Sequence, residues 1–474
     1  MTSKDSGFFK NFTVGRPRHT MVVRLSPYQG DLLATLCWLS ILVQESYIWA
    51  SPDEVLQAGW KDLPSTSLSD LSNLFKTLRL RACRSDQRMI KAIEILEKES
   101  LDQLGGAEIA SGLRELPNAR IGEVSEERRG VGQAVQEMWA SHRGGEGWQG
   151  SPIELARLMV ALAKPSVLDH VYDPFAGRGG FLIEAWKICE KEASSSIRLS
   201  GSEINPVAWA RTQVLFSIYG IEADLRLENA FSFRTPMEKP TLILTDPPVF
   251  SGKEIGPGNP TPRNTATANL PNSLIGSFVG IDQILSDLYE TRGRAFVVVP
   301  PRVLFGGGSV ARARQIWVIK DCLEAVVTLP RGLFHPVTHL PMALAVFNLG
   351  KSNLRKGRVL LIDGEELGRL NLTSKFSSDI FENQSSRILE AFHTFQPIPR
   401  FSAIATFEDI KSHDWNLSPK GYLAQPPDPH HHPDLEGLTL QVAQLEAEAE
   451  KAQNRFRSSA EDLRTWLKDA RTSR

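Results

Sequence analysis

Between residues 148 and 350 the sequence alternates short apolar runs with stretches that have helical periodicity. This alternation is typical of an α/β fold in which helices cover both faces of a parallel sheet, because parallel strands need helical crossovers between them. The pattern therefore predicts an open parallel sheet. The expected strands are 170–173, 198–203, 223–227, 241–245, 295–299, 324–329 and 343–349, and the expected helices are 180–191, 206–219 and 310–319.

The strand expected at 241–245 ends at Asp246-Pro247-Pro248. Proline has no N–H and a fixed φ, so two prolines end strand pairing and hold the backbone rigid with its carbonyls turned outward. The carboxylate of Asp246 and the carbonyl of Pro247 then form two hydrogen-bond acceptors at one place. Such a pair suits an exocyclic amino group on a heteroaromatic ring, whose nitrogen is a poor nucleophile until both its hydrogens are held.

A glycine-rich loop, Asp173-Pro-Phe-Ala-Gly-Arg-Gly-Gly180, follows the first expected strand and opens a helix. Glycine lets a ligand approach the bare backbone, and a helix N-terminus offers free N–H groups to a carboxylate. Glu203, at the end of the next strand, has the chemistry to accept both hydroxyls of a ribose. Nicotinamide-binding folds share these two features, but a dehydrogenase has no evident use for an acceptor pair beyond the fourth strand. Asp173, Glu203, Asn229 and Asp246 all fall at strand ends, so we expect them to line one crevice.

Composition places the chain among ordinary globular proteins. Its 474 residues carry a net charge of −1, so no overall positive field would attract a nucleic acid, and phosphate binding would need a local patch or a partner. Four cysteines are scattered without metal-type or disulfide-type spacing, which favours a reducing compartment. No signal peptide is recognisable, and the longest apolar stretch, Leu32–Val43, is too short to span a bilayer. We therefore expect a cytoplasmic protein.

Residues 1–140 show helical periodicity and predict a small helical domain, with residues 117–147 as a linker rich in Gly, Arg and Glu. The segment Lys76–Lys91 contains six Lys or Arg residues among sixteen. Two interpretations stay open at this point: a solvated helix face, or a surface that contacts phosphates.

Residues 426–474 form a third region. It begins with a Pro-rich hinge that contains His430, His431 and His432, which we interpret as a hinge and not as a metal site. Apolar residues then recur at alternating steps of four and three, with only Ser459 interrupting, which predicts a heptad seam about 50 Å long. Such a strip needs a partner helix, either from another subunit or from its own chain. Its residues are Leu438, Val442, Leu445, Ala449, Ala452, Phe456, Leu463, Trp466 and Ala470.

The order of glycine loop, acidic residue and Asp-Pro-Pro resembles the gamma arrangement of amino-group DNA methyltransferases. The fuller resemblance is to the modification subunit of type I restriction-modification systems. It runs from about residue 145 to 425 and rests on further motifs in the family's order. These are Gly147-Trp-Gln-Gly-Ser-Pro-Ile-Glu-Leu-Ala-Arg-Leu-Met159, Val298-Val-Pro-Pro-Arg-Val-Leu-Phe-Gly-Gly-Gly308, Leu329-Pro-Arg-Gly-Leu-Phe334 with Thr338, and Asp414-Trp-Asn-Leu-Ser-Pro-Lys-Gly-Tyr422.

The resemblance implies a Rossmann-like methyltransferase sheet over residues 141–425 with S-adenosylmethionine as cofactor. Asp246, Pro247 and Pro248 would hold the N6 amino group of an adenine in DNA, flipped out of the duplex. The family's C-terminal helix packs on a separate specificity subunit, and a second copy of the chain and a restriction subunit are further implied partners. The implied cofactor residues are Trp148, Ser151, Pro152, Asp173, Phe175, Gly177, Gly179, Glu203 and Asn229.

Three features depart from the family pattern. Position 249 is Val where an aromatic residue usually stacks on the base, although Phe250 follows and is a candidate substitute. Asp246 stands where this subfamily more often has Asn, and Arg178 stands in the glycine loop where a small residue is usual. A catalytically inactive subunit that acts in DNA binding or assembly is therefore an alternative.

The segment 251–272 is rich in Gly, Pro, Asn and Thr and is expected to be irregular. It is either a surface loop or a flap over the flipped base. In the second case Lys253 and Arg263 are candidates for phosphate contacts.

Overall fold

The structure of the chain is a computed structural model. The chain divides after Leu423 into two compact units, and every described residue belongs to the first unit. The structure describes residues 12–13, 20–21, 87–103, 132–133, 136, 150–192, 197–232, 238–248, 270, 272–335, 341–369 and 376–423.

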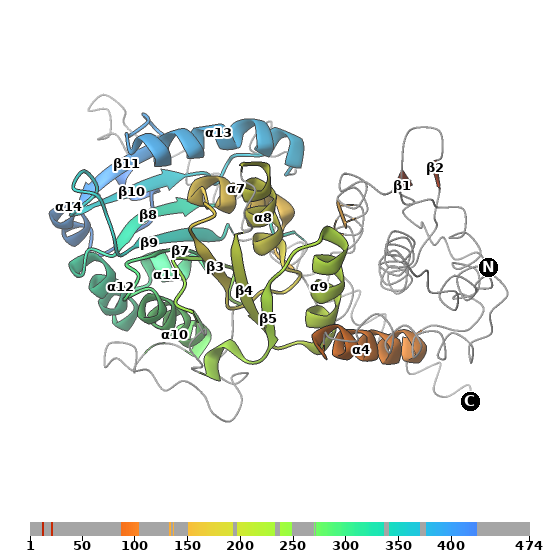
Figure 1. Cartoon of the computed structure of the whole chain (residues 1–474). Helices are drawn as coiled ribbons and strands as arrows, with labels where there is room; N and C mark the ends of the chain where they lie inside the picture. Colours follow the sequence, from red (N-terminus) through yellow and green to blue (C-terminus); the bar gives the residue numbers. More distant parts are fainter. Residues whose placement is uncertain are drawn as a thin grey trace, which may run out of the picture. The chain divides into compact units, whose positions relative to one another are not determined.

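One large mixed sheet dominates the described residues, with the strand order β11-β10-β8-β9-β7-β6-β3-β4-β5 (Figure 1). A separate two-residue ladder pairs β1 (Phe12–Thr13) with β2 (Thr20–Met21). The strands of the large sheet are β3 (His170–Asp173), β4 (Arg198–Glu203), β5 (Asp224–Leu227), β6 (Leu242–Thr245), β7 (Arg294–Val299), β8 (Leu323–Thr328), β9 (Ala343–Asn348), β10 (Arg358–Asp363) and β11 (Ser402–Thr406).

The sheet differs from the expected all-parallel arrangement. Strands β5, β4, β3, β6 and β7 are parallel, as predicted, but β9 runs antiparallel to both β7 and β8, and β11 runs antiparallel to β10. The described part of the connection between β8 and β9 contains turns and no helix, and a chain without a helical crossover returns as an antiparallel strand. Strands β10 and β11 were not predicted.

Helices lie on both faces of the sheet (Figure 1). One buried apolar cluster joins α4, α7, α8, α9 and α13 to the first face, and a second joins α10, α11, α12 and α14 to the opposite face. The helices are α4 (Gln87–Gln103), α7 (Ile153–Ala163), α8 (Gly180–Glu192), α9 (Pro206–Tyr219), α10 (Asn272–Asp287), α11 (Arg302–Phe305), α12 (Ser309–Ile319), α13 (Ser378–Thr394), α14 (Phe407–Ser412) and α15 (Lys420–Leu423), with one 3₁₀ turn, η3 (Ala230–Ser232).

Helix α9 shows why the local sequence folds as it does. The Asn205 side chain accepts hydrogen bonds from the backbone N–H groups of Val207 and Ala208, and Pro206 stands at the first helical position. Gly220 then ends the helix with φ of 76°, a conformation that favours glycine. These signals fix both ends of the helix where the sequence predicts them.

The faces of β3, β4 and β5 differ in chemistry. Val171, Leu199 and Leu225 belong to the first apolar cluster, beneath α8 and α9. Among the residues described, β4 and β5 contribute nothing to the second cluster, because their other face carries polar side chains. The expected apolar covering on both faces is therefore wrong for this edge of the sheet.

The described part of the N-terminal region packs on the same edge. Met89, Ala92 and Leu96 of α4 are buried in the first apolar cluster, and the Arg88 guanidinium pairs with Asp224 of β5 at 2.6 Å. Gln136, in the segment expected to be a linker, accepts hydrogen bonds from the Tyr219 hydroxyl at 3.1 Å and the Lys187 ammonium at 3.2 Å. No helix in the described part of the chain has the length and apolar character needed to cross a membrane.

Several predictions fall outside the described residues and stay predictions. They concern the apolar stretch 32–43, the basic residues 76–86, most of the segment 251–272, and Trp148, Val249, Phe250 and Thr338. The histidine-containing hinge and the heptad seam of residues 426–474 also lie there.

Candidate functional site

Four polar residues meet at the carboxyl edge of neighbouring strands. Asp173 is the last residue of β3, Glu203 is the last residue of β4, and Asp246 follows β6 directly. Asn229 follows β5 after one intervening residue. Because β6, β3, β4 and β5 are adjacent and parallel, their ends lie along one edge of the sheet, where open α/β sheets bind ligands.

Asp173 is fully buried. Its Oδ1 accepts hydrogen bonds from the Thr245 hydroxyl at 2.9 Å and from the backbone N–H of Phe175 at 3.1 Å, whereas its Oδ2 has no hydrogen-bond partner among the described residues. Burial raises the pKa of this carboxyl to about 8, although both hydrogen bonds act in the opposite direction. An unpartnered buried carboxylate oxygen is costly in a folded protein and marks a place where a donor belongs.

The glycine loop is held by Glu203. The backbone N–H of Gly177 donates to Glu203 Oε2 at 2.8 Å, and that of Asn205 donates to Oε1 at 2.7 Å. Burial raises the pKa of this carboxyl, against the effect of these hydrogen bonds. Each carboxylate oxygen retains a second lone pair, so Glu203 can still accept from two further donors.

Glycine is required at position 179. Its φ is +70°, and a Cβ there would lie 2.7 Å from Cε1 of Phe216 and 2.8 Å from Cγ2 of Thr212. The Thr212 hydroxyl also donates to the carbonyl of Gly177 at 2.7 Å. Helix α9 therefore shapes the loop by direct contact.

The catalytic candidate Asp246 is partly exposed, and Ser151 is its hydrogen-bond donor. The Ser151 hydroxyl donates to Asp246 Oδ2 at 2.8 Å. Burial raises the pKa of Asp246 to about 6, and the Ser151 hydrogen bond lowers it. Pro247 is buried and Pro248 is exposed, so the rigid turn projects from the end of β6.

An exposed apolar side chain follows Glu203. Ile204 is 64% exposed, which is unusual for isoleucine directly after a buried strand. The rings of Phe175 and Phe231 lie 5.3 Å apart, and Asn229 Oδ1 accepts from the backbone N–H of Phe231 at 2.9 Å. Ile204 and Phe231 were not predicted from the sequence. An apolar residue immediately after the strand-terminal carboxylate is the signal that would have found Ile204.

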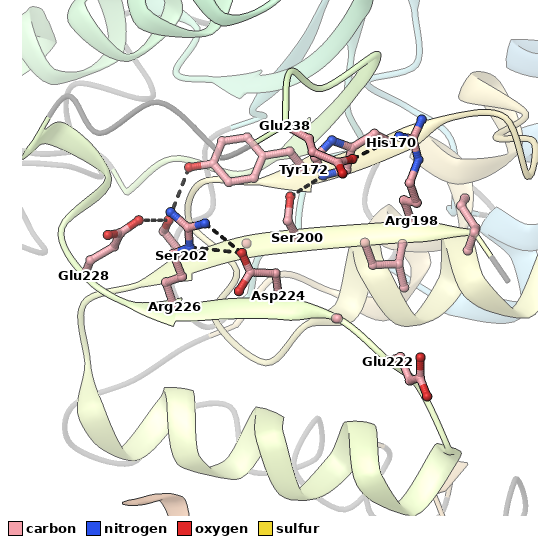
Figure 2. Close-up of a pocket in the computed structure, with 14 residues that line it drawn as sticks. His170, Tyr172, Arg198, Ser200, Ser202, Glu222, Asp224, Arg226, Glu228 and Glu238 are labelled. Atoms are coloured by element: carbon pink, nitrogen blue, oxygen red, sulfur yellow. Dashed lines mark hydrogen bonds and ion pairs between the residues drawn. The ribbon is translucent and has the colours of Figure 1, made fainter. Parts of the chain in front are cut away.

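A pocket of about 330 Å³ lies elsewhere, on the polar face of β3, β4 and β5. Figure 2 shows its side chains on the face of the sheet that points away from α9. Most of its polar groups pair with one another. The pairs are His170 Nε2 with Ser200 Oγ (2.7 Å), the Tyr172 hydroxyl with Ser202 Oγ (3.2 Å), Ser202 Oγ with Glu228 (3.1 Å), Arg226 with Asp224 (2.8 Å) and Arg198 with Glu238 (2.9 Å).

These mutual pairs distinguish the pocket from the residues at the strand ends, although His170 Nδ1 has no hydrogen-bond partner in the described part of the chain. Burial lowers the pKa of His170 and raises the pKa of Tyr172, so both side chains are neutral near pH 7. At the strand ends, three acidic groups have no Lys, Arg or His partner in the described ranges, whereas Asp224 and Glu238 of the pocket pair with Arg226 and Arg198. The strand-end residues are therefore the stronger candidates for chemistry. No group of three or more His, Cys, Asp or Glu side chains within the described ranges is arranged to hold a metal ion.

Comparison with known proteins agrees with this geometry. The profile of the "N-6 DNA Methylase" family matches residues 134–430, which is more than half of the chain. The chain belongs to the N-6 DNA methylase family. The matched region includes every described strand of the large sheet and all four strand-end residues.

The chain is also similar to type I restriction enzyme methylase subunits. The MjaVII methylase subunit of Methanocaldococcus jannaschii is 26% identical over 314 residues, which cover 62% of this chain and 52% of that protein. The HindI methylase subunit of Haemophilus influenzae is 24% identical over 58% of this chain and 62% of that protein. This member of the N-6 DNA methylase family thus spans little more than half the length of these two relatives.

Solved structures show the same fold. The methyltransferase subunit of a type I restriction-modification system from Streptococcus thermophilus superposes with a TM-score of 0.63 at 17% identity, covering 83% of this chain and 94% of that chain. A modification subunit of a type I restriction enzyme from Vibrio vulnificus gives a TM-score of 0.59 at 18% identity, covering 81% and 87%. The predicted fold class, a Rossmann-like methyltransferase sheet, is confirmed.

Proposed function

We propose that this N-6 DNA methylase transfers a methyl group from S-adenosylmethionine to the N6 amino group of adenine in DNA. The observation that carries the proposal is the position of Asp246-Pro247-Pro248. This turn ends the strand next to β3, beside the glycine loop of a chain in the N-6 DNA methylase family. An acceptor pair and a cofactor-type loop on adjacent strands suit transfer between two bound molecules.

The residues at the crevice fit S-adenosylmethionine. The unpartnered Oδ2 of Asp173 suits an ammonium group, and the free lone pairs of Glu203 suit two ribose hydroxyls. The exposed side chain of Ile204 offers a flat apolar contact for an adenine ring. Gly177 and Gly179 would let the methionine part approach the backbone, with Phe175, Asn229, Trp148, Ser151 and Pro152 as the remaining candidates.

The chemistry assigned to this chain is mainly orientation. The bound cofactor supplies an electrophilic methyl group on its sulfonium. Asp246 and the carbonyl of Pro247 each accept one hydrogen of the adenine amino group, which makes the nitrogen more tetrahedral and frees its lone pair. Pro248 keeps that carbonyl in place. Reaching this turn requires the base to leave the duplex, at a cost of a few kcal/mol.

We also propose that the chain works as the modification subunit of a restriction-modification or related defence system. Its relatives are named as type I restriction enzyme methylase subunits, and its net charge of −1 favours a partner that supplies DNA contacts. The heptad seam at 438–470 is the candidate surface for a separate specificity subunit. A second copy of the chain and a restriction subunit are further proposed partners, and the proposed location is the cytoplasm.

The test is methyl transfer from tritiated S-adenosylmethionine to unmethylated plasmid DNA, with the chain co-purified with the proteins encoded beside its gene. Asp246→Ala should reduce incorporation at least about 1,000-fold, because it removes one of two acceptors and the orientation of the base. Its affinity for the cofactor, measured by calorimetry, should stay within about twofold of wild type.

Glu238→Ala is the matched control. Glu238 is an exposed carboxylate paired with Arg198, on the polar face of the sheet, and its loss should leave transfer unchanged. Unchanged activity of Asp246→Ala would refute the assigned role. Wild-type complexes that bind DNA and cofactor but transfer no methyl group would instead favour the inactive assembly subunit.

A further inference from the structure

The contact between Ser151 and Asp246 joins two parts of the chain that lie 95 residues apart, with the Ser151 hydroxyl 2.8 Å from Oδ2. Among the described residues, Ser151 is the hydrogen-bond donor that reaches the Asp246 side chain. The resemblance to the methyltransferase family placed Ser151 with the cofactor. The structure instead directs its hydroxyl to the carboxylate that would hold the target base.

Helix α7 holds Ser151 in place. Ser151 stands two residues before the helix, and the carbonyl of Pro152 accepts the first helical hydrogen bond from Ala156 at 3.1 Å. The helix itself is buried along Leu155, Met159 and neighbouring apolar residues. Its polar side is tied to α13, where the Ser378 hydroxyl donates to Glu154. Packing within this chain therefore holds the backbone that follows Ser151, whereas the Ser151 side chain is exposed.

The contact gives one of the two Asp246 carboxylate oxygens a hydrogen-bond donor and leaves the other without one. Oδ2 accepts from Ser151, and Oδ1 has no partner within the described part of the chain. A hydrogen bond to one oxygen fixes the plane of a carboxylate, since rotation about the side-chain bond would break it. Oδ1 is thereby left to accept from an incoming donor.

We propose that Ser151 is a positioning residue for Asp246, whose hydroxyl orients the carboxylate so that Oδ1 can accept a hydrogen of the target amino group. This inference rests on the proposed function and adds a residue to its machinery. It assigns Ser151 to the base side of the crevice. Ser151 acts through Asp246 and touches neither the methyl group nor the attacking nitrogen.

The same hydrogen bond affects the charge of Asp246. Burial raises its pKa to about 6 while Ser151 lowers it, so Ser151 keeps more of the carboxylate ionised at a given pH. Asp173 is an ionisable neighbour among the described residues, and the charge of Asp246 contributes to its raised pKa. Activity that needs ionised Asp246 should therefore fall as the pH drops through about 6, and this limb should depend on Ser151.

The experiment compares Ser151→Ala, Ser151→Thr and Asp246→Asn in the co-purified complex. Ser151→Ala should lower kcat about 10- to 100-fold, as expected for a lost hydrogen bond to a charged group. It should move the acid limb of the pH–rate profile to higher pH and leave the dissociation constant for S-adenosylmethionine within about twofold of wild type. Ser151→Thr retains the hydroxyl and should restore kcat to within about threefold.

Asp246→Asn supplies the control for charge. An amide does not titrate, so the acid limb should disappear in this variant, and adding Ser151→Ala should produce no further shift of the pH profile. If Ser151→Ala weakens cofactor binding as much as it lowers kcat and leaves the acid limb in place, Ser151 serves the cofactor and the inference is wrong. If wild type is active and Ser151→Ala has the same kcat and the same pH–rate profile, the role of Ser151 is refuted and the proposed function stands. Absence of transfer by wild type overturns the proposed function as well.

Discussion

Two clusters of ionisable side chains in this protein differ in whether their members have partners of opposite charge. In the first, between β8, β9 and α13, each buried charge has an opposite partner: Glu324 pairs with Arg355, and Lys351 pairs with Asp321 at 2.7 Å. In the second, at the carboxyl edge, three carboxylates gather, and no Lys, Arg or His of the described ranges pairs with any of them. They are Asp173, Glu203 and Asp246.

The first cluster has the features of a structural ion-pair network. The Arg355 guanidinium also donates to the carbonyl of Phe392 at 3.0 Å, and it lies 4.9 Å from the ring centre of Phe395.

Burial shifts the pKa of each acidic group in the second cluster upward, so the folded protein holds these carboxyls against a desolvation cost. Acidic groups whose pKa is raised by burial and that lack a basic partner are typical of sites arranged for a ligand.

The largest expected effect is in the structural cluster. Glu324→Ala leaves the Arg355 cation without its carboxylate and should lower the free energy of unfolding by about 3–5 kcal/mol. Chemical denaturation followed by circular dichroism measures this change. Glu290→Ala, which removes an exposed partner of Lys239, should change it by less than about 0.5 kcal/mol. Equal effects of the two substitutions would contradict the distinction between the clusters.

At Asp173 we expect the opposite effect, a substitution that raises the free energy of unfolding. Its folded-state pKa of about 8 lies above the ordinary value, so the folded protein binds a proton that the unfolded chain releases. The free energy of unfolding should therefore fall as the pH rises from about 4 to about 8. Asp173→Asn does not titrate, should lack this fall, and should be more stable than wild type at pH 8 by about 1–3 kcal/mol.

Denaturation curves at pH 5 and pH 8 separate these outcomes for Asp173→Asn. The same variant should bind S-adenosylmethionine more weakly, because its amide nitrogen replaces an acceptor. A variant that is less stable than wild type at pH 8, with unchanged cofactor affinity, would show that Asp173 is a structural residue.

The smallest effect is expected for an exposed pair. Arg88 of α4 pairs with Asp224, and both side chains are partly exposed, so Arg88→Ala should cost less than about 1 kcal/mol, and less still at high salt. Thermal unfolding at low and high salt measures it. A cost of several kcal/mol would mean that charge, and not the burial of Met89 and Leu96, holds α4 on the sheet.

Much of the sheet could be predicted because its strands carry strong local signals. Residues 170–173 and 198–203 form strands as predicted, and α9 has both of its boundaries as predicted, since its Asn205 cap and Gly220 stop are local. The strand-end residues could be placed at one edge because parallel connectivity brings carboxyl ends together. The alternation of Arg198, Ser200 and Ser202 is a local signal for the polar face of β4, which was not predicted.

The features that could not be predicted depend on contacts between distant parts of the chain, which the local sequence pattern does not show. The direction of β9 is set by its connection, and periodicity alone does not encode it. Helix α10 begins at Asn272, inside the segment expected to be irregular, and α13 was not predicted. The bond from Ser151 to Asp246 spans 95 residues and depends on how α7 packs, which no spacing rule supplies.

The Thr245 hydroxyl that donates to Asp173 has a consequence for how such proteins can diversify. It ties the residue before Asp246 to the end of the neighbouring strand, where the pairs Val171–Leu242 and Tyr172–Ile243 already fix the register. The pairing of β3 with β6 thus sets the spacing between Asp173 and Asp246. Changes in the sequence after position 248 leave these contacts, and with them that spacing, in place.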